Sequence, residues 1–336
     1  MKDDRIIGGE YAIDVSRYQS LGNNLFQGRL FSCGRAALAA ILDHIGGGKR
    51  LLVPDYLCTS ITNTVRDIGW QYSFYHIDEE SLLPKDILEK NLQDFDAVLL
   101  IDYFGMTDVS GCAAEIKKHH ASIKIIEDDV QDFFNDRKNP DIDYYFTSFR
   151  KWFAVPDGAQ VFSKIEDELP GRIHSKNEFA QYKFAGNLLK QYRDDIDDSV
   201  CLELLKKGED ILDQNYLCEC SDITRRLLPK MDFEEIKKKR MENGQVLHEG
   251  LTKMNIRHKW AEGKTPFFIP IFIHERDSVR KIFFKNNMFM PVHWPKESRE
   301  LSGENPLYET ELSLICDQRY SADDMKKILE VLKDAV

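Results

Sequence analysis

Short apolar runs alternate with amphipathic stretches along the first half of the chain. Six runs rich in β-branched and aromatic residues are typical of buried strands, and they span 51–53, 72–77, 97–102, 123–127, 144–149 and 160–162. Helical periodicity lies between several of them, as at 115–120 and at 34–45, where Gly46-Gly47-Gly48 is a strong stop signal. This alternation predicts an α/β fold with a mainly parallel sheet covered on both faces.

The pattern changes after residue 164. Residues 164–213 are polar and charged with few strand signals, so we expect them to be helical or irregular. A compact α+β unit follows, with helices at 232–254 and 276–285, strands at 267–273 and 312–316, and a last helix for which Ser321 is the predicted N-cap and Asp324 the N3 residue. We therefore predict a large domain at 1–225, whose N-terminal segment is free to pack with the other domain, and a small C-terminal domain at 226–336.

Composition narrows the class of protein. The 336 residues include 46 basic and 57 acidic side chains, a formal charge of −11, which disfavours nucleic acids and anionic membrane surfaces as partners. No run approaches the roughly 20 apolar residues that span a bilayer, and the first residues lack the apolar core of a signal peptide, so we expect a cytoplasmic protein. Only Cys218 and Cys220 of the seven cysteines lie close together, and no second pair accompanies them, which favours free thiols over a metal site.

Two residues that follow consecutive predicted strands suggest chemistry. Asp128 ends one strand and Lys151 comes just after the next, so both side chains are expected at one edge of the sheet, where open α/β sheets bind ligands. An amine and a carboxylate are what pyridoxal phosphate (PLP) needs, the amine to bond its aldehyde and the carboxylate to keep its ring nitrogen protonated. Gly34 at the start of the first helix offers free N–H groups to a phosphate. Each residue also has an ordinary explanation, as a strand cap, a surface lysine or a helix cap.

Several motifs, taken in their order along the chain, carry a family resemblance. They are Ser32-x-Gly34-Arg35-Ala36-Ala37-Leu38, Val53-Pro54-Asp55-Tyr56, Tyr103-Phe104-Gly105, Glu127-Asp128-x-x-Gln131, Thr147-Ser148-Phe149-x-Lys151, Pro156-Asp157-Gly158-Ala159-Gln160-Val161, Arg240-x-x-Asn243, Pro291-Val292-His293-Trp294-Pro295 and Leu312-Ser313-Leu314. Together they resemble the DegT/DnrJ/EryC1/StrS aminotransferases over nearly the whole chain. The resemblance implies a fold-type-I PLP-dependent transferase with a sheet of the seven-stranded type.

The resemblance also assigns roles to individual residues. Lys151 would hold PLP as a Schiff base and then move a proton between substrate and cofactor carbons, Asp128 would pair with the pyridine nitrogen, and Gln131 would bond the phenolic oxygen. The matching phosphate contacts are the backbone of Gly34 and Arg35 and the Ser148 hydroxyl.

Some positions depart from the family pattern. Lys151 follows Ser148 after a shorter spacing than in many relatives, and Cys58 stands where many relatives place an aromatic ring over the cofactor. Tyr56 and Tyr103 are then the candidates to stack on the ring. Tyr103 and His293 are also expected near the substrate, although a surface role for His293 is equally open.

The implied activity is transfer of an amino group, from L-glutamate by resemblance, to a keto-sugar that is nucleotide-linked. Arg35 and Arg150 would supply positive charge for the anionic parts of these substrates. A homodimer with sites at the interface is implied as well. Alternatives are a keto-acid or cyclitol acceptor, a PLP-dependent dehydratase, which Lys151 argues against, and a non-catalytic interaction or regulatory protein on the same scaffold.

Overall fold

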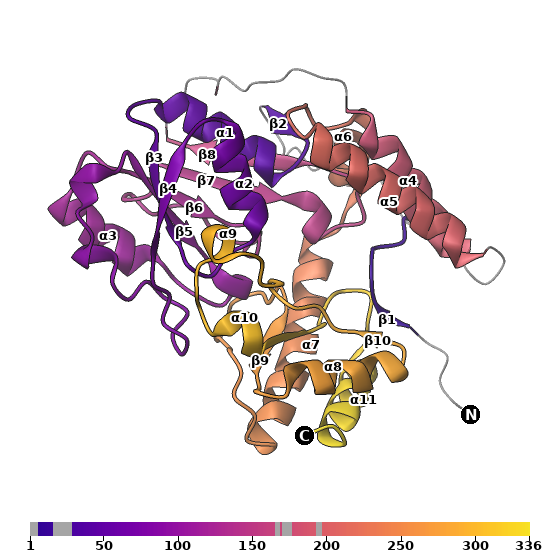
Figure 1. Cartoon of the computed structure of the whole chain (residues 1–336). Helices are drawn as coiled ribbons and strands as arrows, with labels where there is room; N and C mark the ends of the chain where they lie inside the picture. Colours follow the sequence, from indigo (N-terminus) through magenta and orange to yellow (C-terminus); the bar gives the residue numbers. More distant parts are fainter. Residues whose placement is uncertain (1–5, 16–28, 165–168, 170–176, 193–196) are drawn as a thin grey trace.

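The computed structural model describes residues 6–15, 29–164, 169, 177–192 and 197–336 (Figure 1). Its centre is a seven-stranded sheet in the order β2-β8-β7-β6-β5-β3-β4. The strands are β2 (Leu30–Phe31), β3 (Arg50–Pro54), β4 (Gln71–Tyr75), β5 (Ala97–Ile101), β6 (Lys124–Asp128), β7 (Tyr144–Ser148) and β8 (Ala159–Ser163). The six predicted strands are confirmed. The seventh strand, β2, was not predicted, because two residues are too few to show a periodic pattern.

Five neighbouring strands of this sheet, β4, β3, β5, β6 and β7, run parallel, whereas β8 pairs antiparallel with both β7 and β2. Every residue of β5 and β7 is buried, as expected for parallel strands covered on both faces. The register sets Ile101 opposite Asp128 and Asp128 opposite Phe146. The carboxyl ends of β5, β6 and β7 therefore meet at one edge.

Helices α1 (Gly34–Ile45), α2 (Thr59–Asp67) and α3 (Ser110–His119) belong to the sheet region. α1 packs on β7 and β8 and against α2, with seven successive residues, Ala36 to Leu42, buried. It has the predicted bounds and ends at Gly46, whose φ of +62° suits a glycine.

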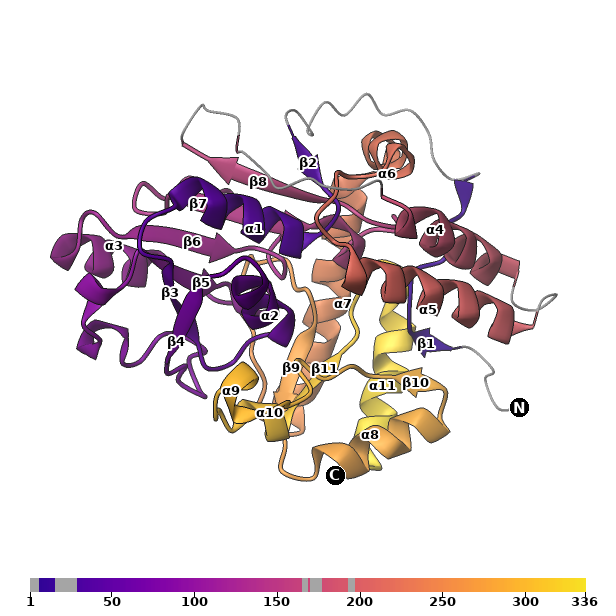
Figure 2. The ribbon, with the colours of Figure 1, turned by 45° about the horizontal axis from the view of Figure 1, so that its top comes forward.

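The charged stretch after β8 is largely helical. α4 (Phe179–Leu189) and α5 (Asp198–Gln214) form a hairpin beside the sheet region, seen in both orientations (Figures 1 and 2). Two glycines permit the close packing: a Cβ on Gly186 would lie 2.8 Å from Leu205 Cγ, and one on Gly208 would lie 2.5 Å from Lys183 Cγ.

The C-terminal region is α+β, as predicted. Its elements are α6 (Asp222–Leu227), α7 (Phe233–Lys253), β9 (Ile269–Phe272), α8 (Arg276–Lys285), β10 (Met288–Phe289), α9 (Arg299–Ser302), α10 (Leu307–Thr310), β11 (Glu311–Leu314) and α11 (Ala322–Lys333). β9 and β11 pair antiparallel. Ser321 caps α11 through a complete capping box with Asp324, so that prediction is confirmed.

Short 3-10 turns complete the chain. They are η2 (Ile87–Glu89), η3 (Leu92–Asp94), η4 (Tyr103–Gly105), η5 (Phe149–Lys151), η6 (Lys190–Tyr192) and η7 (Leu228–Lys230). η4 and η5 matter most here, because they follow β5 and β7 directly.

The N-terminal segment joins the C-terminal region. β1 (Ile7–Gly8) pairs in parallel with β10, with Ile7 opposite Met288, and the two strands lie side by side in Figures 1 and 2. Gly8 N–H also donates a 2.7 Å hydrogen bond to the Tyr320 hydroxyl.

All seven cysteines are free thiols. The described residues hold no group of three or more His, Cys, Asp or Glu side chains arranged to bind a metal ion. Within the same residues, no helix combines the length and apolar character needed to cross a bilayer.

Candidate active site

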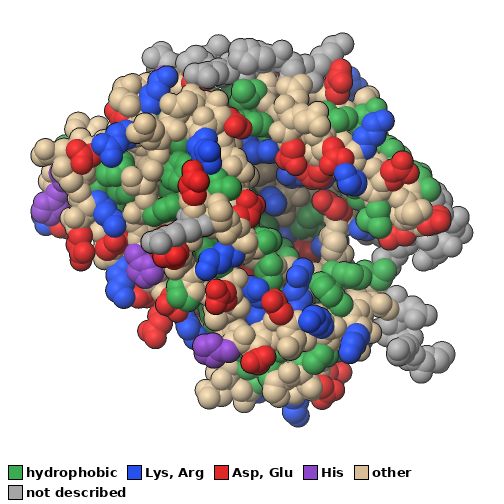
Figure 3. Space-filling model, in the orientation of Figure 1, with side chains coloured by type: hydrophobic (Ala, Val, Ile, Leu, Met, Phe, Trp, Pro, Cys, Tyr) green, Lys and Arg blue, Asp and Glu red, His purple; other side chains and the backbone are tan. Residues whose placement is uncertain are grey.

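A hollow lies between the sheet region and the C-terminal region, with basic side chains visible inside it (Figure 3). Its cavity has a volume of about 220 Å³. The predicted site residues that line it are Gly34, Arg35, Cys58, Asp128, Gln131, Ser148, Lys151 and His293. The carboxyl ends of β6 and β7 and the start of α1 thus converge on one space.

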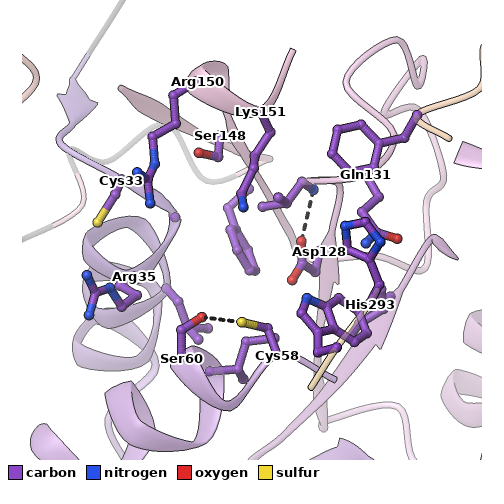
Figure 4. Close-up of a pocket in the computed structure, with 18 of the residues that line it drawn as sticks. Cys33, Arg35, Cys58, Ser60, Asp128, Gln131, Ser148, Arg150, Lys151 and His293 are labelled. Atoms are coloured by element: carbon purple, nitrogen blue, oxygen red, sulfur yellow. Dashed lines mark hydrogen bonds between the residues drawn. The ribbon is translucent and has the colours of Figure 1, made fainter. Parts of the chain in front are cut away.

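Lys151 extends from η5 toward the middle of the cavity (Figure 4). Its side chain is exposed to the open cavity, yet it lies deep in the molecule, and this burial is the main cause that lowers the pKa of its amine. The neighbouring Arg150 lowers it further. A lysine of this kind is more often uncharged, and therefore nucleophilic, than a surface lysine.

Trp152 anchors the turn that carries Lys151. The indole is fully buried, its Nε1–H donates a 2.9 Å hydrogen bond to Val130 O, and the Arg240 guanidinium lies 4.4 Å from its ring centroid. The Gln318 side-chain amide donates to Trp152 O at 2.7 Å. Since Arg240 and Gln318 come from the C-terminal region, both regions of the chain fix the position of Lys151.

Asp128 ends β6 with its carboxylate in the same cavity. Its Oδ1 accepts a 2.9 Å hydrogen bond from Val130 N–H, drawn in Figure 4. Burial raises the pKa of Asp128 from its ordinary value of 3.8 to about 7, against the opposing effects of the Val130 hydrogen bond and of Lys151. A carboxylate desolvated in this way is stabilised by any cation brought beside it.

The start of α1 forms another part of the wall. The Cys33 side chain does not cap the helix, so the first amides have no partner within the helix and attract an anion. A Cβ on Gly34 would lie 3.5 Å from Val130 Cγ2 and 3.6 Å from the Phe146 ring, both in the cavity wall. The buried Ser148 lines the same cavity, and Figure 4 draws its side chain near the start of α1.

Gln131 is fixed by a backbone contact. Its Oε1 accepts a 2.8 Å hydrogen bond from Phe104 N–H in η4. With the oxygen engaged, the NH₂ group is the remaining polar end of the carboxamide, and it can only donate.

His293 lies on the far wall with 12% of its side chain exposed. Its backbone N–H donates to Glu311 Oε2 at 2.6 Å, and its Nδ1 lies 2.8 Å from Ser313 Oγ. Burial, followed by the charge of Lys151, lowers the pKa of His293 to about 3. The ring is therefore neutral near pH 7 and serves as a hydrogen-bonding group.

Tyr56 and Tyr103 do not line the cavity. Both are fully buried and stack on each other with ring centroids 5.5 Å apart. The Tyr103 hydroxyl donates to Tyr56 O and the Tyr56 hydroxyl to His293 O, so the pair supports the His293 segment from below. The aromatic residues in the wall are instead Phe146, Phe267 and Trp294.

Other lining residues were not singled out from the sequence. Ser60 donates its hydroxyl to Cys58 Sγ at 3.1 Å. Glu209 and Asp213, four residues apart on α5, pair with Arg150 at 2.5 Å and Arg35 at 2.9 Å. The only signal for this pair was the i, i+4 spacing of two acids on a helix.

Comparison with known proteins gives matches in structure alone. No family model and no curated protein sequence matches the chain. Spr1654, named a sugar aminotransferase of Streptococcus pneumoniae and solved in a PLP form, aligns over 92% of this chain and 87% of its own at 15% identity and a TM-score of 0.67. The sugar aminotransferase CalS13 from Micromonospora echinospora aligns over 98% and 94% at 12% identity and a TM-score of 0.69. A DegT/DnrJ/EryC1/StrS aminotransferase from Brucella abortus aligns over 91% and 85% at 17% identity and a TM-score of 0.62.

The chain has the fold of these aminotransferases. The fold-type-I architecture that the sequence resemblance implied is therefore confirmed. The aminotransferase fold extends over both the sheet region and the C-terminal region, since the matches cover more than nine-tenths of the chain.

Proposed function

We propose that the protein is a PLP-dependent aminotransferase. The observation that carries this proposal is the convergence of Lys151 and Asp128, from the ends of neighbouring strands, in one cavity that also receives the start of α1. A fold shared with sugar aminotransferases over most of the chain supports the same activity.

The residues in the cavity fit PLP. A bound cofactor would supply an aldehyde for covalent attachment and a ring that accepts electrons from the reacting carbon. Lys151 Nζ would make the covalent bond, and Asp128 would hold the ring nitrogen in its protonated form, which also offsets the cost of burying the carboxylate. The phosphate would lie against the amides of Gly34 and Arg35 and the Ser148 hydroxyl.

Proton transfer falls to Lys151. When not covalently bound, its amine would take a proton from the substrate carbon and return it, because the lowered pKa favours the uncharged base form. His293 carries no extra proton to donate near pH 7 and accepts one poorly, because burial lowers its pKa to about 3. Its role would be to bind substrate or orient Lys151, and the NH₂ group of Gln131 would donate to the cofactor's phenolic oxygen.

For the substrates we propose L-glutamate as donor and a nucleotide-linked keto-sugar as acceptor. The names of the neighbouring proteins support a sugar, and one of them was solved with its TDP-sugar product. Arg35 and Arg150 in the cavity wall, each paired with a carboxylate of α5, would supply positive charge for a substrate carboxylate or diphosphate.

We also propose a division into domains and an oligomeric state. The chain would divide at about residue 225 into a PLP-binding domain, 1–225, and a small domain, 226–336, and it would act as a homodimer with sites at the interface.

The test is the absorption spectrum of the purified protein with added PLP, before and after L-glutamate. The wild type should show the visible band of a lysine-bound cofactor, lose it with glutamate, and retain the cofactor on Lys151 after borohydride reduction. Lys151→Ala should do none of these. Lys138→Ala, which removes a lysine whose side chain is 79% exposed, should behave as wild type. A wild type that stays colourless with PLP would reject the proposal and favour the non-catalytic alternative.

A further inference from the structure

Four charged side chains of alternating sign form a row that ends beside Lys151. Glu10 Oε1 lies 3.4 Å from Lys183 Nζ, Lys183 bonds Glu209, and Arg150 Nη1 lies 2.5 Å from the same Glu209 oxygen. The four residues come from the N-terminal segment, α4, α5 and η5. We refer to this row as the charge row.

Lys183 is the buried member of the charge row. Only 1% of the Lys183 side chain is exposed, and within the part of the chain that the structure describes its carboxylate partners are Glu10 and Glu209. An ammonium group in such a position requires close anionic partners. Gly208 creates the space for it, because a Cβ there would lie 2.5 Å from Lys183 Cγ.

Glu209 connects the two cations of the charge row, since its Oε1 pairs with both Lys183 and Arg150. Burial alone would raise its pKa, yet Arg150 and Lys183 lower it to about 2. The carboxylate is therefore ionised near pH 7, where it holds Arg150 against the cavity wall. Arg150 precedes Lys151 directly in η5.

We propose that the charge row tunes the reactivity of the Lys151 amine beyond the effect of burial, with Arg150 as the acting charge and Glu209 as the residue that positions it. Arg150 adjoins Lys151 in η5, so a proton on the Lys151 amine would add a second positive charge close to the guanidinium. The uncharged amine is favoured as a result. The proposal deepens the proposed function, and the catalytic meaning of the row rests on that function.

The environment of Lys151 contains effects of both signs. Arg150 disfavours the charged amine, whereas Glu10, Glu209 and Cys58 favour it, and Asp128 and His293 interact with it from β6 and the far wall. The net effect of each charge is therefore open to measurement by removing it.

The test measures how fast Lys151 reacts with formaldehyde and cyanoborohydride across pH, in the full chain freed of cofactor by dialysis against hydroxylamine. Peptide mass spectrometry reads the methylation of Lys151 alone. Below the pKa of the amine, Arg150→Gln should slow labelling about fivefold, because the lost charge favours the ammonium form. In a Glu209→Gln background the same substitution should change labelling less than about twofold, since Arg150 is no longer held in place.

Asp210→Asn is the matched control background. Asp210 adjoins Glu209 on α5 but pairs with Lys206 at the surface, so the effect of Arg150→Gln should stay about fivefold there. Glu10→Gln is a second, independent variant. Glu10 is 44% exposed, and loss of its charge should speed labelling about twofold.

An Arg150→Gln profile that matches wild type would overturn the proposal. An equal effect of Arg150→Gln in the Glu209→Gln background would overturn the positioning role of Glu209. If Arg150→Gln does not fold, an unchanged Glu10→Gln profile counts against the row in its place. Labelling needs no cofactor, so these results stand apart from whether the protein binds PLP.

Discussion

The buried carboxylate of Asp128 should lower the free energy of unfolding of the cofactor-free protein near neutral pH. Replacing it in Asp128→Asn should remove this cost. Burial raises the pKa of this carboxyl from 3.8 to about 7, so the folded chain binds the proton more tightly than the unfolded chain does. Below pH 4 the group is protonated in both states and costs nothing. As pH rises toward 7 the unfolded chain loses the proton first, and the free energy of unfolding falls.

The size of this change in the free energy of unfolding follows from the difference between the pKa values of the folded and unfolded chain. Each pKa unit corresponds to about 1.4 kcal/mol, and between pH 5 and 8 the two states differ in protonation over about two units, which gives ~2–3 kcal/mol. Asn can still accept the hydrogen bond that Val130 N–H donates to Oδ1. The stability of Asp128→Asn relative to wild type should therefore rise by about that amount over this pH range.

The assay is urea unfolding of both cofactor-free proteins at pH 5 and pH 8. Glu311, a buried carboxyl whose pKa burial raises to about 8, titrates in both proteins, so its contribution cancels in the difference. Asp136→Asn, at a side chain 83% exposed, should track wild type. Equal differences between Asp128→Asn and wild type at the two pH values would refute the reasoning.

Three substitutions test how the site is supported. Arg240→Met should lower the free energy of unfolding by about 3 kcal/mol, because two backbone carbonyls in a buried region lose their donor; a loss under 1 kcal/mol in urea unfolding would contradict this. Gly105→Ala should lower the free energy of unfolding by about 2 kcal/mol or more. It should also weaken PLP binding, measured by fluorescence titration. At Gly105 φ is +68°, and a Cβ would lie 2.7 Å from Thr265 O and 2.9 Å from Gln131 O; binding as tight as wild type would count against it. Ser321→Ala should lower the free energy of unfolding by about 1 kcal/mol, measured by thermal unfolding, because α11 loses its N-cap. The affinity for PLP should not change, and an altered affinity would show that α11 influences the site.

Local patterns predicted much of the fold because local chemistry determines it. The Gly46-Gly47-Gly48 stop gave the end of α1, and Ser321 with Asp324 gave the start of α11. α2 was not predicted, since its polar sequence buries only Ile61, Thr62, Thr64 and Val65. A helix with so narrow an apolar face depends on tertiary packing, here against α1, β4 and α9, which its own sequence does not reveal.

The candidate site divides in the same way. Asp128 and Lys151 could be placed together because strand order alone sets the edge where they emerge. The burial of Tyr56 beneath His293 depends on a contact between residues 237 positions apart, and the pairing of Glu209 with Arg150 depends on how α5 packs. Neither leaves a trace in the spacing of the sequence.

The pairing of β1 with β10 has a consequence for synthesis of the chain. Gly8 bonds Tyr320 across 312 positions, so the segment around residue 8 leaves the ribosome long before its partner exists. Until then its two strand residues present unpaired backbone groups, and the contact can form only after Tyr320 has emerged. Closure of the molecule is thus expected as one of the last events of folding, and ribosome-bound chains that stop before β10 should expose the N-terminal segment to proteases that spare it in the finished protein.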